Sequence, residues 1–222
     1  MDLKFNIIKF EEINLLITAR HPSNQYLQEL NTLIKDVLFY YKNNYQDTTN
    51  KSILGIHPGG KQVLVVVECL LQGKKVAVKI YKPIITHLIV HTVAISYITK
   101  HLEEFNNSLS NQQINLSFPL TIALGQPTSS DFVNPISILI QEWIEESEEI
   151  HKVYPREHVN MIRTIIRILT VHWGFMVDIM SKNWLVVAQN QKLTYVDLVL
   201  FNPVGEILEM IKDLTKKLDC MI

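Results

Sequence analysis

The stretch that most constrains the fold is ILGIHPGGKQVLVVVECLLQGKKVAVKIYKP, residues 53–83. Its three apolar runs are rich in Val and Ile, and two breaks, at 57–60 and 72–75, separate them. Such runs are typical of strands joined by short turns, so the stretch predicts an antiparallel meander. Pro83 ends the meander because proline has no backbone N–H for a sheet hydrogen bond. The rest of the chain must therefore cover an antiparallel sheet.

The remaining segments predict helices and further strands around this meander. Apolar residues at helical spacing predict helices, and short apolar runs predict strands. The predicted helices cover 24–45, 86–105, 157–173 and 204–219, and the predicted strands cover 116–124, 136–144, 184–188 and 193–199. Residues 3–18 predict either one strand or a strand pair, and the acidic run 142–150 predicts a solvated loop.

Composition excludes several classes of protein. With 47% hydrophobic residues among 222, the chain can bury a core. Its 21 Lys and Arg against 22 Asp and Glu argue against nucleic-acid binding through a broad basic surface. Cys69 and Cys220 form no zinc or disulfide pattern, and Cys69 is expected to be buried. We see no secretory signal and no apolar run of ~18 residues, so we expect a soluble, reduced, cytoplasmic protein without a membrane span.

Two polar features of the meander suggest chemistry. Lys79 lies within the apolar third strand, and a lysine is seldom buried without a partner; the alternative is a lysine that points to solvent from an edge strand. Three of the seven glycines, Gly55, Gly59 and Gly60, fall within six positions. Glycines let a backbone approach phosphate closely, although a tight hairpin turn requires them equally well.

A third feature comes late in the chain. Asp178 precedes Asn183 by five positions, in a loop between the helix 157–173 and the next strand. Asp197 follows in an apolar strand, YVDLVLF, where a buried carboxylate needs a cation or a metal beside it. Asn183 and Asp197 offer the oxygen atoms that Mg²⁺ prefers. The alternative for Asp197 is a turn-forming residue at the end of a strand.

Taken in this order, the motifs resemble the protein-kinase-like superfamily. They comprise a glycine loop, the VAVK sequence with Lys79, an Asp–x₄–Asn loop, and an Asp after the following hairpin. The stretch SILIQEWIE, 137–145, resembles the strand and hinge that hold adenine in that superfamily. The resemblance covers residues 53 to about 200.

The resemblance implies an α+β, two-lobed kinase-like fold. The N-lobe would cover 1–145, with an extension and helix in 1–50 and a five-stranded antiparallel sheet with one inserted helix in 51–145. A reduced, mostly helical C-lobe would cover 146–222.

The resemblance also implies ATP and Mg²⁺ as cofactors, with a role for each matching residue. Lys79 would pair the α- and β-phosphates, and Asp178 would be the catalytic base. Asn183 and Asp197 would hold Mg²⁺. Nucleotide contacts would come from Gly55, Gly59, Gly60, Gln141, Glu142 and Trp143.

Several residues depart from the superfamily pattern. His57 and Pro58 replace the usual middle of the glycine loop, and Met176 and Val177 stand where protein kinases carry His and Arg. The helix after Lys79 offers Glu103, or no residue, as the partner of that lysine. Only 25 residues follow Asp197, too few for the helices that dock a peptide substrate.

We therefore predict a divergent kinase-like phosphotransferase with an unidentified, non-peptide acceptor. The alternative is a pseudokinase-type module that binds another protein without catalysis. A third interpretation is an unrelated α+β protein whose motifs match by coincidence. A small-molecule or protein partner stays undefined in each case.

Overall fold

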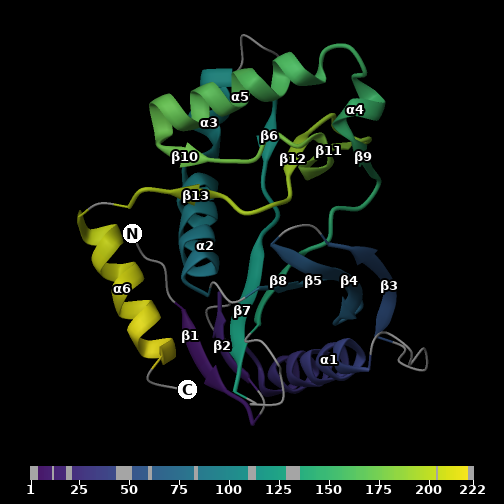
Figure 1. The fold of residues 1–222 in the computed structure, drawn as a ribbon, viewed down its shortest axis with the longest axis vertical. Helices are drawn as coiled ribbons and strands as arrows, with labels where there is room; N and C mark the ends of the chain where they lie inside the picture. Colours follow the sequence, from purple (N-terminus) through teal and green to yellow (C-terminus); the bar gives the residue numbers. More distant parts are fainter. Residues whose placement is uncertain are drawn as a thin grey trace. The chain divides into compact units, whose positions relative to one another are not determined.

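The computed structural model of the chain describes residues 5–11, 13–18, 22–43, 52–59, 62–82, 85–109, 114–128, 136–203 and 205–219. The chain divides into two compact units, and Figure 1 shows the elements of both. The sheet unit comprises residues 2–85, 121–143 and 213–222, and the helical unit comprises 86–120 and 144–212. The contacts therefore group 86–120 with the helical unit, whereas the sequence placed them in the N-lobe; the lobe boundary at 145 stays a prediction.

The sheet unit is built on one antiparallel sheet of order β1-β2-β7-β8-β5-β4-β3. Its elements are β1 (Asn6–Lys9), β2 (Ile13–Ile17), α1 (Asn24–Lys42), β3 (Ile53–Pro58), β4 (Val63–Leu71), β5 (Lys74–Tyr81), β7 (Thr121–Pro127) and β8 (Ser137–Glu142). The meander predicted over 53–83 is confirmed as β3, β4 and β5.

The prediction of five strands is wrong, because this sheet has seven. Within the stretch 3–18, β1 and β2 form the strand pair, one of the two alternatives, and β2 extends the sheet by pairing with β7. All five residues of β2 are buried, so this strand requires a neighbour on each side and both faces covered. A strand of this composition is unsuited to the solvent-exposed edge of a sheet.

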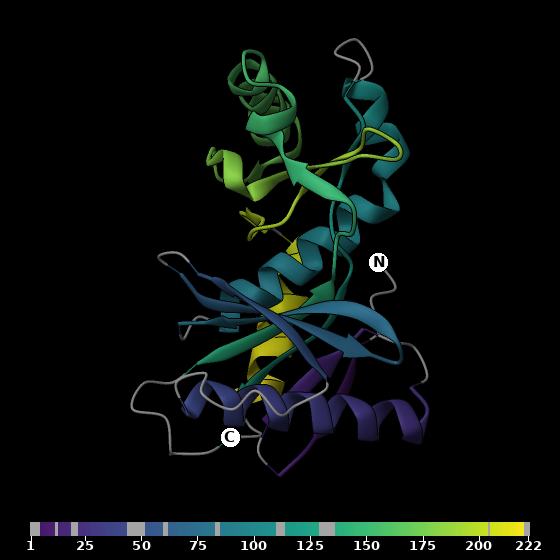
Figure 2. The ribbon, with the colours of Figure 1, turned by 90° about the vertical axis from the view of Figure 1, so that its right-hand side faces the viewer.

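Helix α1 covers one face of this sheet (Figure 2). Ser23 caps the helix, its hydroxyl accepting a hydrogen bond from the Tyr26 N–H at 3.1 Å. The buried helix residues pack in one core with alternate residues of β4, β5 and β8, a set that includes Leu30, Ile34, Val37, Val65, Val67, Cys69, Val78, Ile80 and Ile140. Because strand side chains alternate, Lys79 lies on the opposite face of the sheet. Cys69 is buried, as predicted.

The helical unit packs helices around a small four-stranded sheet of order β6-β12-β11-β9. Its elements are α2 (Ile85–Lys100), α3 (Leu102–Leu109), β6 (Leu116–Ser117), β9 (Ser147–Glu149), α4 (Ile150–Val153), α5 (His158–Trp173), β10 (Phe175–Met176), the 3₁₀ turn η2 (Ser181–Asn183), β11 (Trp184–Val187), β12 (Leu193–Tyr195), β13 (Leu200–Phe201) and α6 (Gly205–Asp219). The residues of α6 from Asp213 onward group with the sheet unit.

Three local predictions for the helical unit need correction. The acidic run 142–150 is not all loop, because Ser147–Glu149 pairs with β11 as a strand. The strand predicted over 193–199 ends at Tyr195, and Asp197 lies in a bend after it. The helix predicted over 86–105 is interrupted at His101. None of the described helices is long and apolar enough to cross a lipid bilayer.

Gly125 provides a test of the unexpected β2–β7 pairing. A methyl group at this position would meet the Leu15 side chain and the Asn14 carbonyl oxygen of β2. We expect Gly125→Ala to lower the free energy of unfolding by about 1–3 kcal/mol, because the strands must separate to admit it. Gly55→Ala is the control, since its methyl group would make only ordinary contact with Glu68 and should change stability by less than about 1 kcal/mol. Equal effects in urea titrations would contradict the pairing.

Candidate functional site

An asparagine joins two carboxylates in the helical unit. The Nδ2 group of Asn183 donates hydrogen bonds to Oδ2 of Asp197 at 3.0 Å and to Oδ2 of Asp178 at 3.3 Å. The structure therefore brings together the three late polar residues singled out in the sequence. We refer to Asp178, Asn183 and Asp197 as the acidic cluster.

The loop 178–183 is shaped by its own hydrogen bonds. Oδ1 of Asp178 accepts from the Met180 N–H at 3.1 Å, a local turn typical of aspartate. The Asn183 N–H then donates to the Met180 carbonyl at 3.0 Å as the 3₁₀ turn closes. Asn183 is buried, whereas Asp178 is exposed. This arrangement leaves the Asp178 carboxylate accessible while a buried amide group fixes its orientation.

Two buried aromatic residues hold the backbone of Asp178. Trp184 Nε1 donates to the Asp178 carbonyl at 3.0 Å, and the Asp178 N–H donates to the Tyr195 hydroxyl at 2.8 Å. Trp184 and Tyr195 are cross-strand partners in β11 and β12, with ring centroids 4.7 Å apart. The hairpin thus fixes both peptide groups beside the candidate base.

The same hairpin reaches the bend that carries Asp197. The Tyr195 hydroxyl donates to the Leu198 carbonyl at 3.3 Å, and the Val196 N–H donates to the Asn183 carbonyl at 2.9 Å. The Val199 N–H donates to Nδ1 of His91, on α2, at 2.9 Å. Burial raises the pKa of Tyr195, so its hydroxyl keeps the proton that it donates. Residues 196–199 are therefore held from three other segments of the unit.

The donor set of the acidic cluster fits Mg²⁺. The Asn183 NH₂ group is used by the carboxylates, so its Oδ1 is the atom of that side chain with lone pairs for a cation. Mg²⁺ binds one or two carboxylates together with phosphate oxygens and water, and it does not need a cage made wholly of protein. Within the described ranges, no three His, Cys, Asp or Glu side chains gather to hold a metal.

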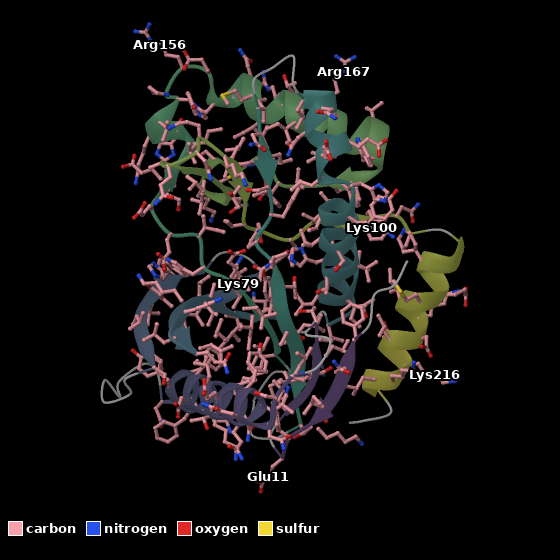
Figure 3. The ribbon with its side chains drawn as sticks, turned by 180° about the vertical axis from the view of Figure 1, so that it is seen from behind. Glu11, Lys79, Lys100, Arg156, Arg167 and Lys216 are labelled. Carbon is pink, nitrogen blue, oxygen red and sulfur yellow. The ribbon has the colours of Figure 1, made fainter. Side chains whose placement is uncertain are left out.

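Lys79 lies in the sheet unit, in the middle of β5 (Figure 3). Its register partners are Val66 on β4 and Leu139 on β8, so the alternative of an edge-strand lysine is wrong. The residue is 7% exposed. Ala77 precedes it on the same face and pairs with Gln141, which is also buried. A buried cationic side chain thus stands on the sheet face opposite α1, beside small and apolar residues.

The glycines divide between turn and strand. A side chain at Gly59 would overlap the backbone of Val63 and Leu64, so the β3–β4 hairpin itself requires glycine there. Gly55 lies on β3 opposite Glu68 and has room for a methyl group. Gly60 lies outside the described residues. The hairpin explains Gly59, and the phosphate role of all three glycines stays a prediction.

The predicted hinge residues differ in exposure. Glu142 is exposed, and Trp143 is half-buried with its N–H donating to the Lys75 carbonyl at 3.4 Å. The Trp143 ring lies 5.2 Å from that of His57, the residue found in place of the middle loop glycine. Glu103, the predicted partner of Lys79, is exposed on α3 in the helical unit. That ion pair stays a prediction.

The structure adds three residues that the sequence did not assign to the acidic cluster, namely His91, Trp184 and Tyr195. Trp184 directly follows Asn183, and Tyr195 precedes Asp197 by two positions, so proximity in sequence was the available signal. His91 lies 108 positions before Val199, and no sequence pattern connects them.

Comparisons with known proteins contribute little. No family model and no curated protein matches the chain. WaaP, solved in complex with acyl carrier protein, is 14% identical with a TM-score of 0.37, covering 79% of this chain and 75% of that one. The aerobactin synthetase IucC from a hypervirulent pathotype of Klebsiella pneumoniae is 8% identical with a TM-score of 0.46, covering 94% of this chain and 52% of that one. This chain thus matches about half of the synthetase, and neither likeness carries the functional argument.

Replacing Tyr195 tests the hairpin support of the acidic cluster. We expect Tyr195→Phe to lower the free energy of unfolding by about 1–2 kcal/mol, because the part-buried Asp178 N–H and the buried Leu198 carbonyl lose their partner. Tyr154→Phe is the control, because the Tyr154 hydroxyl bonds an exposed Gln191 at 3.0 Å, and its effect should stay within about 0.5 kcal/mol. Equal losses in chemical denaturation would contradict the assigned role.

The raised pKa of Tyr195 predicts that the free energy of unfolding falls at alkaline pH. Because burial raises its pKa in the folded protein, the unfolded chain releases this proton first, near the ordinary pKa of about 10. The contribution is fully present below that pH and is lost as the pH rises above it. We expect the fall in stability between about pH 9 and 11 to be shallower in Tyr195→Phe. Identical pH profiles for the parent and the variant would contradict this assignment.

Proposed function

We propose that this chain is a divergent kinase-like protein that binds ATP with Mg²⁺ and transfers the γ-phosphoryl group to a non-peptide acceptor. The observation that carries the proposal is the acidic cluster, in which a buried amide group holds an accessible carboxylate beside a half-buried one. Enzymes that transfer phosphate need such a base next to oxygen ligands for the metal.

Each residue of the acidic cluster has one role in the proposed reaction. Asn183 and Asp197 would hold Mg²⁺, which when bound neutralises charge on the phosphate oxygens. The Asp178 carboxylate orients the acceptor hydroxyl and takes its proton. The acceptor oxygen then forms a bond to the γ-phosphorus, the bond from that phosphorus to the β–γ bridging oxygen breaks, and ADP leaves with that electron pair.

Lys79 would supply the positive charge for the α- and β-phosphates. Its ammonium group is largely removed from water, where an ion pair with phosphate is stronger than at a solvated surface. Ala77 lies on the same sheet face, and the candidate contacts for adenine are Gln141 and Glu142, at the end of β8, and Trp143, which follows it. Gly55, Gly59 and Gly60 would approach the phosphates.

The described chain after Asp197 supports a non-peptide acceptor. Residues 198–203 include the short strand β13, and α6 begins at Gly205. Protein kinases place a long peptide-binding segment after the corresponding Asp. This chain has only a short connection there, which favours a small acceptor.

A binding module without catalysis is the second candidate. Apolar side chains surround Asp178, with Met176, Ile179 and Met180 about half exposed. Exposed apolar groups beside a polar site are typical of surfaces that bind another molecule. This module would keep the fold, would bind another protein with or without the nucleotide, and would show no turnover.

Thermal unfolding with and without Mg·ATP tests nucleotide binding. A ligand that binds only the folded state raises the unfolding midpoint, and a concentration 100 times the Kd adds about 2.7 kcal/mol. We expect the parent to show this shift and Lys79→Ala and Asp197→Ala to lose it. Lys74→Ala, an exposed lysine on the same strand, is the matched control and should keep the shift. No shift in the parent would refute the ATP-dependent enzyme and leave the binding module as the function.

Hydrolysis of ATP, with water as the acceptor, separates enzyme from binding module. We expect Asp178→Asn to keep the Mg·ATP thermal shift and to lower the hydrolysis rate by about 10²–10⁴-fold, since only proton transfer is removed. Nucleotide binding without hydrolysis in the parent would leave the module as the function. Equal hydrolysis in the parent and the variant would exclude Asp178 as the base.

A further inference from the structure

We propose that His91 is a positioning residue for Asp197, acting through the backbone of the bend 196–199. The inference rests on the proposed function, because it concerns the aspartate assigned to the metal. His91 lies on α2, outside the kinase-like motifs, and it belongs to the same unit as the acidic cluster.

The contact is a single buried hydrogen bond. The N–H of Val199 donates to Nδ1 of His91 at 2.9 Å, and the two residues are 0% and 1% exposed. A backbone N–H buried without an acceptor costs free energy, so this imidazole satisfies a donor that water does not reach. The bond therefore holds Val199 to α2.

This bond completes the support of the bend. Val196, on one side of Asp197, donates to the Asn183 carbonyl, and Leu198, on the other side, accepts from Tyr195. The Asn183 amide group holds the Asp197 carboxylate itself. Without the His91 bond, the bend would still be held by β11 and β12 residues, by the η2 turn and by Leu200, which pairs with Met176 of β10, but the Val199 N–H would lose its acceptor.

The Val199–His91 hydrogen bond also defines the protonation state of the His91 imidazole. For Nδ1 to accept a hydrogen bond it must carry a lone pair, so His91 is neutral in this arrangement, with its proton on Nε2. An aliphatic side chain could fill the same space among buried Leu88 and Ile95, but it would offer no acceptor. The choice of histidine at this apolar helix position is explained by the Val199 N–H.

Amide hydrogen exchange of the protein without ligand tests the contact directly. We expect His91→Leu to exchange about tenfold faster or more over residues 193–201, because the Val199 N–H loses its acceptor. His91→Asn should restore part of the protection, because the asparagine Oδ1 can take the place of Nδ1. Leu109→Ala, a cavity in the same core on α3, is the control for general loss of stability.

Mg²⁺-dependent binding tests the consequence for Asp197. We expect His91→Leu to keep the thermal shift given by ATP with EDTA and to lose most of the additional shift given by Mg²⁺. His91→Asn should recover part of this additional Mg²⁺-dependent thermal shift, and Leu109→Ala should keep all of it. If His91 only filled space in the core, an asparagine with an acceptor atom at a similar position would not restore the Mg²⁺-dependent shift.

The outcomes separate this inference from the proposed function. If the parent shows no shift with Mg·ATP, the proposed function and the metal-positioning role both fall. If the parent responds and His91→Leu keeps the full Mg²⁺ contribution, only the inference is overturned. Unchanged exchange over 193–201 in His91→Leu overturns it as well. Faster exchange there, a lost Mg²⁺ contribution and rescue by asparagine together support it.

Discussion

One amide group organises the part of this protein where chemistry is expected. Nδ2 of Asn183 donates to a carboxylate on each side, at 3.0 and 3.3 Å, and so draws two like charges toward one nitrogen atom. Two carboxylates repel each other in a partly buried site unless hydrogen bonds or a cation offset the repulsion. Asn183 itself is buried at the end of a 3₁₀ turn, and the β11–β12 hairpin fixes the backbone around it. Both carboxylates accept a hydrogen bond from this side chain, and the Asp178 carboxylate accepts a second one from the Met180 N–H.

The two faces of the sheet in the sheet unit differ in the side chains that they carry. One face of the seven-stranded sheet is covered by α1 through an apolar core, and the other carries Lys79 with Ala77 and Gln141. Burial of an ammonium group among apolar strands is costly without a partner. Among the residues of this face, Lys79 is the one that we propose to contact the nucleotide phosphates.

Much of the local structure could be predicted from residue patterns. The meander over 53–83 follows from short apolar runs, which also predict one strand or a strand pair over 3–18, and α1 and α5 follow from helical spacing. The sequence prediction failed for strands whose own residues are polar or whose pairing partner is remote in the sequence. The acidic stretch before Ile150 reads as loop, yet its residues Ser147–Glu149 form a strand because β11 offers a free edge to pair with. Similarly, β2 joins the sheet through β7, a strand more than 100 positions away.

The sequence alone determined which residues could carry chemistry and placed Asp178 and Asn183 in one loop, because five positions span a single turn. Only the tertiary structure decided that Asp197 shares the Asn183 amide group and that Trp184, Tyr195 and His91 hold the surrounding backbone. The physical reason is the range of the interactions. Helix and strand preferences act between near neighbours, whereas hydrogen bonds such as that from Val199 to His91 join groups 108 positions apart and exist only once the core has packed.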